Sequence, residues 1–206
     1  MNLIFYVTNP AFSASLAGFP PCTKTSYEGV LQTTRSGLLF FLNNFYLQDY
    51  QKIRKNMTIR KIKKNEIDQL VELYFHYISE ENLPSITKIK MDNIWNQIES
   101  NPCINYFVLE VEEKIIASCI LTITPSFIRG GDGFGIIEHV VTNSDFRRKG
   151  FGESIVKYSL DYAWGNGCTE VMLLSGSKNK NAHKMYEKIG FDKYRKTGFI
   201  MYKPGK

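Results

Sequence analysis

The residues whose types and spacing could do chemistry are concentrated in one basic, glycine-containing stretch, residues 147–152. It reads Arg147-Arg148-Lys149-Gly150-Phe151-Gly152 and comes between an apolar, strand-like run over 136–142 and an amphipathic, helix-like run over 154–164. The first N–H groups of a helix have no partner within the helix and carry the positive end of its dipole, so they attract anions. Two glycines let the main chain approach such an anion closely, and three cations add Coulomb attraction. The stretch therefore predicts a turn that binds phosphate.

The spacing within this turn excludes the two common nucleotide motifs. A P-loop needs G-x-x-x-x-G-K-[ST] and a dinucleotide site needs G-x-G-x-x-G, and neither pattern is present here. A second glycine-rich run, residues 129–133, has no helix after it, which is typical of a mobile turn between antiparallel strands. We therefore expect a different phosphate-bearing cofactor.

Periodicity after residue 56 predicts the elements that hold this turn. Apolar residues at helical spacing predict a helix from Ile67 to Ile78 and another from Ile86 to Ile98. Gly190 is expected to end a last helix over 181–189. The predicted strands cover 58–62, 104–111, 115–123, 136–142 and 169–174, with a final pair near 191–194 and 199–202. This order indicates an α/β fold (α+β mixed sheet) in which helices flank a central mixed sheet.

Two motifs in this order resemble a known family. The R-x-x-G-x-G pattern of residues 147–152 is followed by an N-x-x-A-x-x-x-Y pattern formed by Asn179, Ala182 and Tyr186. Together they resemble the cofactor site and C-terminal helix of the GCN5-related N-acetyltransferases (GNAT family), and the resemblance runs from Met57 to Tyr202. It implies the acyl-CoA N-acyltransferase (GNAT) fold, acetyl-CoA as co-substrate, and direct transfer of an acetyl group to the primary amine of a small molecule.

Within the family, residues 137–144 and 168–191 are most similar to the glucosamine-6-phosphate N-acetyltransferases. In those enzymes the equivalent of Glu138 is followed by aspartate, and a glutamine often opens the turn. This chain has His139 and Arg147 at those two positions. The identity of the acceptor amine therefore stays open.

The resemblance also implies roles for the residues around the turn. Backbone amides from Arg148 to Gly152 are expected to hold the CoA pyrophosphate, and the three cations to attract it. The pantetheine arm is expected to run beside the main chain of residues 140–142, where a backbone N–H could stabilise the thioester oxygen. The cofactor-binding residues expected in this way are Val140, Val141, Thr142, Arg147, Arg148, Lys149, Gly150, Phe151, Gly152 and Asn179.

Two side chains are candidates for catalysis, Glu138 and Tyr186. Glu138 interrupts an apolar run, where an unpaired carboxylate is costly, so it indicates a polar cleft and a general base. An exposed strand residue facing water is the alternative. Tyr186 matches the tyrosine of the second motif and is the expected general acid for the CoA sulfur, although twelve tyrosines make a packing role a real alternative. His139 is expected to face the opposite side of its strand.

Residues 1–56 differ in composition from the rest of the chain. They contain five Lys or Arg and two acids and show no sustained periodicity. We expect an N-terminal extension that is poorly ordered or not part of the domain, followed by an N-acetyltransferase domain over 57–206, with Met57 as a candidate initiator. A targeting segment is the alternative, weakened because residues 1–17 hold no Lys or Arg.

Net charge and cysteine content limit the ligands that the protein is expected to bind and the compartment in which it is expected to work. A net charge of +6 over 206 residues is mild and suits a small anionic ligand better than nucleic acid. The apolar run 38–42 is too short to span a membrane. Four separated cysteines and three scattered histidines suggest no metal and no disulfide framework, which favours a cytoplasmic protein. A homodimer, a protein or peptide N-acetyltransferase and a non-catalytic CoA-binding module remain open.

Overall fold

A single five-stranded sheet organises the part of the chain that the structure describes. The computed structural model describes residues 53, 55–75 and 86–204, which belong to one compact unit spanning Tyr50–Lys206. Strands β1 to β4 pair antiparallel in chain order, and β5 pairs parallel to β4. The strands are β1 (Met57–Lys61), β2 (Ile104–Val111), β3 (Lys114–Thr124), β4 (Gly133–Thr142) and β5 (Cys168–Leu173). This mixed sheet confirms the predicted fold class.

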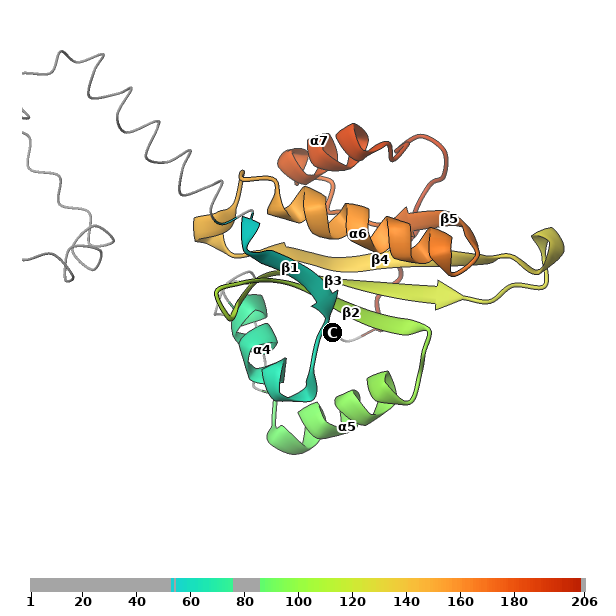
Figure 1. Cartoon of the computed structure of the whole chain (residues 1–206). Coiled ribbons are helices and arrows are strands. Elements are labelled where there is room, and N and C mark those ends of the chain that lie inside the picture. The colour runs from blue at the N-terminus through green and yellow to red at the C-terminus, as the bar shows by residue number, and fades with distance from the viewer. Residues whose placement is uncertain (1–52, 54, 76–85, 205–206) are drawn as a thin grey trace, which may run out of the picture. The chain divides into compact units, whose positions relative to one another are not determined.

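Helices cover both faces of the sheet (Figure 1). Helices α6 (Phe151–Gly165) and α7 (Lys180–Ile189) lie on one face, and α4 (Ile67–Phe75) and α5 (Lys88–Glu99) lie on the other. The parallel pair β4–β5 needs a crossover, which α6 supplies. Each face therefore has its own apolar cluster. The α6 cluster includes Phe107, Leu109, Leu121, Ile155 and Val156, and the α4–α5 cluster includes Leu70, Leu73, Trp95, Val108 and Val141.

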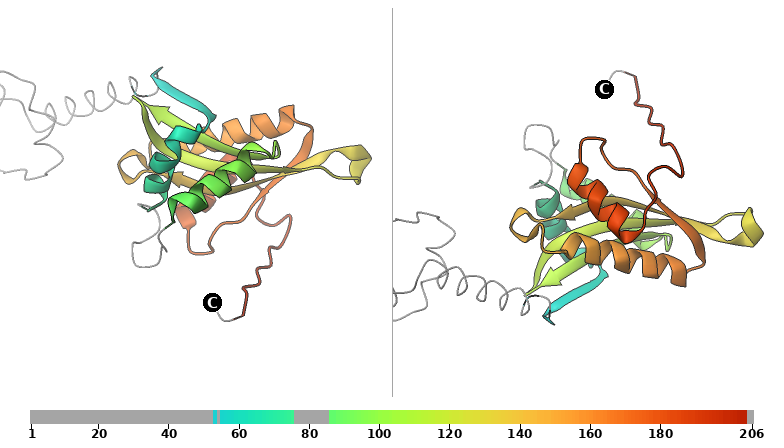
Figure 2. Two further views of the ribbon diagram at one scale, coloured as in Figure 1. Left: turned by 90° about the horizontal axis from the view of Figure 1, so that it is seen from below. Right: turned by 90° about the horizontal axis from the view of Figure 1, so that it is seen from above.

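The two hairpins behave differently at their tips. The β2–β3 hairpin turns through Glu112 and Glu113, both at positive φ (49° and 65°), which is the backbone of a tight two-residue connection. The β3–β4 ladder continues out to Thr124 and Phe134, and a short 3-10 turn closes it. Figure 2 shows this second hairpin projecting beyond the sheet. The glycine-rich run 129–133 is thus a hairpin tip, as the sequence predicts.

The predicted final strand pair is wrong within the described residues. No strand follows α7 up to residue 204, and beyond Phe191, which packs against the α6 cluster, the segment expected to alternate is exposed. Its aromatic side chains are exposed, Tyr194 by 86% and Phe199 by 91%. A strand is stable only when its backbone groups and its apolar face both find partners, and this segment has neither. The predicted helical position Ile78 and residues 1–52 lie outside the described residues.

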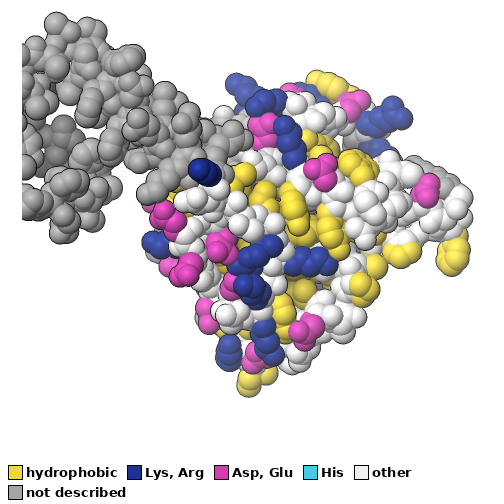
Figure 3. Space-filling model, in the orientation of Figure 1, with side chains coloured by type: hydrophobic (Ala, Val, Ile, Leu, Met, Phe, Trp, Pro, Cys, Tyr) yellow, Lys and Arg dark blue, Asp and Glu magenta, His cyan; other side chains and the backbone are white. Residues whose placement is uncertain are grey.

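The domain surface carries both signs of charge. On the face drawn in Figure 3, Lys and Arg side chains are interspersed with Asp and Glu. Ile53, four residues before β1, packs against the α6 cluster. In the described ranges, no helix is both long and apolar enough to cross a membrane.

Candidate active site

The phosphate-binding turn predicted from the sequence is a left-handed turn that opens α6. Arg148 has φ of 59°, and Gly150, the residue that precedes the helix, has φ of 80° and ψ of 0°. No side chain caps the start of α6. Its first N–H groups are therefore available to an anion, and left-handed residues in a turn direct successive N–H groups inward as an anion-binding nest does. The geometry fits a phosphate group, and contact with one remains a prediction.

The three cations of the turn have different surroundings. The Nε of Arg147 donates to the carbonyl oxygen of Thr142 at 3.0 Å, and the Nζ of Lys149 donates to the carbonyl oxygen of Asp145 at 2.8 Å. Arg147 thus ties the turn to the end of β4, and Lys149 ties it to the 3-10 turn over Ser144–Phe146. Arg148 is exposed and makes no hydrogen bond or ion pair with any described residue. Of the three, Arg148 is best placed to reach a ligand.

Gly152 is where three elements meet. A β-carbon at this position would lie 3.3 Å from the Sδ of Met185 and 3.3 Å from the Oγ1 of Thr142. Contacts this short are tighter than ordinary packing, so α6, α7 and the end of β4 approach as closely as they do because residue 152 has no side chain. Phe151, also predicted to bind cofactor, has its side chain in the core with 1% exposed. Only its backbone could touch a ligand.

Strand β4 has an open edge next to this turn. Its pairing with β5 ends at Ile137 and Leu173, whereas β4 continues to Thr142. Over residues 138–142 no other described strand lies on that side of β4. The side chains of Val140 and Val141 belong to the α6 cluster and the α4–α5 cluster respectively, so their main chain is what a ligand at this edge would contact. An added extended group could pair there as a strand does.

Glu138 lies on the α4–α5 face of the sheet, beside an aromatic hydroxyl. Tyr106, Ile120 and Glu138 face one another across β2, β3 and β4. Burial and, secondarily, the negative charge of Glu138 raise the pKa of Tyr106. The Glu138 carboxylate is exposed and has no hydrogen bond or ion pair to any residue the structure describes. It is therefore available to an incoming amine.

His139 corrects one expectation. Its φ of 48° falls at a register shift in the β3–β4 ladder, which interrupts the alternation of side chains along β4. The imidazole lies against the ring of Tyr74 on α4, with 6.0 Å between ring centroids. Tyr74 is bonded in turn to Ser118, which occupies the same face as Ile120 and Glu138. The prediction that His139 faces away from Glu138 is wrong because a bulge intervenes.

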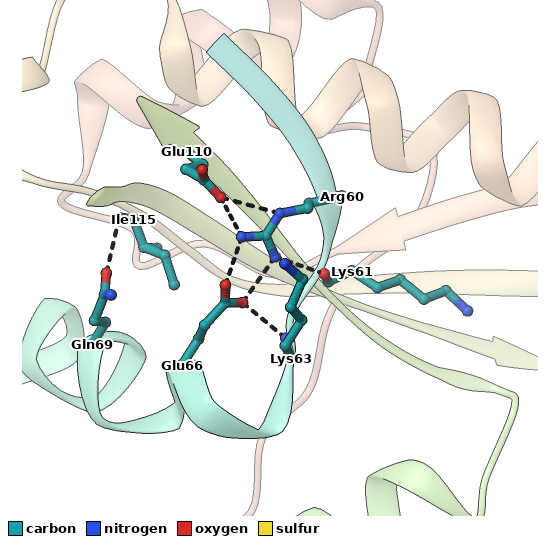
Figure 4. A network of polar contacts seen from close by, with 7 residues as sticks. All are labelled: Arg60, Lys61, Lys63, Glu66, Gln69, Glu110 and Ile115. Atoms are coloured by element: carbon teal, nitrogen blue, oxygen red, sulfur yellow. Dashed lines mark hydrogen bonds and ion pairs between the residues drawn. The ribbon is translucent and has the colours of Figure 1, made fainter. Parts of the chain in front are cut away.

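Helix α4 is fixed in place by an ion-pair network (Figure 4). Arg60 on β1 bonds the carboxylates of Glu66, just before α4, and Glu110 on β2. The hydrogen bonds that Arg60 donates to Glu66 are the main reason that the pKa of Arg60 is raised and that the pKa of Glu66 is lowered. One turn later, Gln69 accepts the N–H of Ile115 at 3.3 Å. These contacts hold the start of α4, the helix that carries Tyr74, against the sheet.

The residues predicted on α7 belong to the face of the sheet opposite to that of Glu138. Asn179 caps α7, its Oδ1 accepting the N–H of Ala182 at 3.2 Å, so a structural role accounts for that oxygen. Tyr186 is partly buried against the α6 cluster, with its ring 5.9 Å from that of Phe191.

A groove of about 990 Å³ runs along β5, α7 and residues 190–198. Tyr186 lines this groove, but none of residues 138–152 does. Of the predicted site residues, Tyr186 is therefore the one that lines the groove. In the described part of the chain, no three His, Cys, Asp or Glu side chains gather as a metal site would require.

Sequence reasoning missed the aromatic residues around Glu138. Tyr74 and Tyr106 were interpretable only as helical and strand core positions, because nothing in the sequence shows which residues pair across strands. The left-handed conformation of His139 had no sequence signal either. A charged residue next to a histidine inside an apolar run was the available hint.

The fold and the site define an acyltransferase, and comparison with known proteins gives the family. Residues 67–191 match the model of the Acetyltransferase (GNAT) family. The chain belongs to this family and is an N-acetyltransferase. The family uses acetyl-CoA.

Relatives and solved structures agree with this assignment. The glucosamine 6-phosphate N-acetyltransferase of Trypanosoma brucei brucei is 26% identical over 137 residues, covering 66% of this chain and 89% of that protein. The crystal structure of glucosamine-6-phosphate N-acetyltransferase from Arabidopsis thaliana superimposes with a TM-score of 0.61 at 28% identity, covering 73% of this chain and 99% of that one. The aminoglycoside N-acetyltransferase AAC(6')-Iy in complex with CoA shares the fold, with a TM-score of 0.58 at 16% identity over 71% of this chain and 93% of that one.

Proposed function

We propose that this protein transfers the acetyl group of acetyl-CoA directly to the primary amine of a small molecule. The observation that carries the proposal is the layout of β4. Its open edge ends at the uncapped start of α6, and its side-chain face presents the unpartnered carboxylate of Glu138. One strand can thus hold both the thioester and the amine in a ternary complex.

On the cofactor side, backbone groups do most of the binding. The N–H groups of residues 148–152 receive the pyrophosphate, and Arg148 adds a charge. The main chain of Val140, Val141 and Thr142 lies beside the pantetheine arm, where an N–H stabilises the developing oxyanion. Asn179 binds through its amide nitrogen, since its oxygen caps α7.

On the chemical side, proton transfer falls to two groups. An alkylammonium has an ordinary pKa near ~10.4, so a base must take a proton before nitrogen can attack, and Glu138 is placed to do so. Tyr186 protonates the departing thiolate. No metal is needed for either step.

Glucosamine 6-phosphate is the first acceptor to test, because several relatives carry that name over most of their length. A peptide amino terminus is the second. It is favoured by a 58-residue segment that is 43% identical to N-alpha-acetyltransferase 30 of Xenopus laevis, although this covers only 21% of that protein.

Cys103, Cys119 and Cys168 are free thiols, which suits the reducing cytoplasm proposed as the location of this protein. Homodimers are compatible with the proposal, and nucleic acid and membrane have no part in it.

An acceptor screen that measures release of free CoA tests the proposal. We expect turnover with an amino sugar, polyamine or aminoglycoside and none with peptides. Turnover only with peptides would favour the second acceptor class, and acetyl-CoA binding without any turnover would indicate a non-catalytic CoA-binding protein.

The same screen tests whether residues 1–56 are dispensable. A chain starting at Met57 is expected to keep its activity. Because Ile53 packs against the core, a second chain starting at Tyr50 separates loss of that contact from loss of a function in the extension.

A further inference from the structure

Two titratable side chains stand next to each other on the α4–α5 face of β4. Glu138 pairs with Ile120 and Val141 pairs with Ser118, which leaves two residues of β4, His139 and Val140, opposite one residue of β3. A bulge of this kind re-aims side chains. His139, like Glu138, is exposed and has no hydrogen bond or ion pair among the residues described.

The imidazole of His139 packs against the ring of Tyr74. The two rings are inclined at 43°, and the hydroxyl of Tyr74 lies 3.2 Å from the Oγ of Ser118. That phenol is therefore already engaged and does not occupy a nitrogen of the imidazole. Among the described residues, neither ring nitrogen of His139 has a hydrogen-bond partner, so both can reach a ligand.

The reaction requires more than one proton acceptor. An ammonium acceptor must lose two protons in becoming an amide, since R–NH₃⁺ plus CH₃CO–SCoA gives R–NH–COCH₃, CoA–SH and one H⁺. The first proton must leave before the nitrogen lone pair attacks the carbonyl carbon and its π electrons move to oxygen. The second leaves as the C–S bond breaks and its electrons pass to sulfur. The thiolate then takes up one proton, and the other goes to solvent.

We propose that His139 is a second proton acceptor for the amine, acting beside Glu138. The inference rests on the proposed function and extends it, because each of the two protons then has a base at one of two adjacent positions of β4. Imidazole is the side chain that most readily accepts and releases protons near neutral pH. One group takes the first proton, and its neighbour takes the second.

Among the residues that the structure describes, the groups that face this pair come from three other elements. They are the phenols of Tyr74 on α4 and Tyr106 on β2, and the hydroxyl of Ser118 on β3. Burial raises the pKa of both phenols, so they are uncharged at neutral pH. Among the residues that the structure describes, the charge beside His139 is then that of Glu138.

The test is the pH dependence of kcat/KM for His139→Gln, with glucosamine 6-phosphate or the best acceptor of the screen at saturating acetyl-CoA. We expect kcat/KM at neutral pH to fall by about 10²-fold, the low end for a positioned acid–base group because Glu138 remains. One ionisation between about pH 5 and 8 should disappear from the profile. Added imidazole should restore activity to His139→Ala in proportion to its unprotonated fraction.

His183→Gln is the matched control, since it removes an imidazole on α7 that bonds the carbonyl oxygen of Gly176, which lies before that helix. It should keep the wild-type profile. Wild-type rate and profile in His139→Gln, or no rescue of His139→Ala by imidazole, would overturn the inference. An inactive wild-type protein would overturn the proposed function itself and with it the role of His139, an outcome distinguished by the absence of any rate to compare.

Discussion

Replacing Gly152 by alanine tests whether close approach of three elements builds the cofactor site. The new β-carbon would lie 3.3 Å from both Met185 and Thr142, so either side chain must move by a few tenths of an ångström. Overpacking of this kind costs about 1–3 kcal/mol. Removing a helical glycine gains up to about 1 kcal/mol. The net loss in unfolding free energy is therefore about 0–3 kcal/mol.

Gly165→Ala is the control, because Gly165 is in the last turn of the same helix and a β-carbon there meets nothing within 4 Å. The helix-propensity gain is shared by the two variants, so the difference between them isolates the overpacking cost of about 1–3 kcal/mol. Urea unfolding measures this difference. Calorimetry should show weaker acetyl-CoA binding for Gly152→Ala, by about tenfold if the turn loses some 1.4 kcal/mol of contact. Equal stability and equal affinity for the two variants would refute the reasoning.

Three further predictions follow from the site and its supports. Tyr186→Phe should lower kcat by about 10²-fold or more without changing the Kd of acetyl-CoA, because it removes the proton for the thiolate, and an unchanged rate would remove Tyr186 from the mechanism. Arg60→Met should cost about 1–3 kcal/mol in urea unfolding, since it leaves Glu66 and Glu110 without their shared cation. The pKa of folded Glu66 is lowered from 4.5, so its contribution is present above pH 4.5 and lost as pH falls through the folded value. The stability gap between wild type and Glu66→Gln should accordingly be widest near neutral pH and shrink in acid.

Local patterns predicted most of the elements because each element here has a clear apolar periodicity. The strand over 104–111 has the predicted bounds, and the last helix begins one residue before its predicted start. The helix over residues 151–165 starts three residues early because its first turn, with Phe151 buried, belongs to the helix and not to the loop. The final strand pair failed because alternation describes a side-chain pattern and cannot supply a partner edge.

The site was predictable in part for the same reason. The glycine positions and the carboxylate within an apolar run can be read directly from the sequence, so the turn and Glu138 could be predicted. The bulge at His139 could not, since it depends on how two strands align over Ser118 and Ile120. The different contacts of Arg147, Arg148 and Lys149 could not be predicted either, because they depend on which backbone carbonyl, if any, each side chain reaches.

At the end of β4, the groups proposed to bind the acyl donor differ in kind from those proposed to bind the acceptor amine. On the proposed arrangement the thioester carrier is held by main-chain amides, which every amino acid possesses, while the acceptor meets side chains on the opposite face. Substitutions at positions 138 and 139 can then change which amine is acetylated without disturbing the carrier. A fold with this arrangement can evolve toward new acceptor amines while it keeps the same acyl donor.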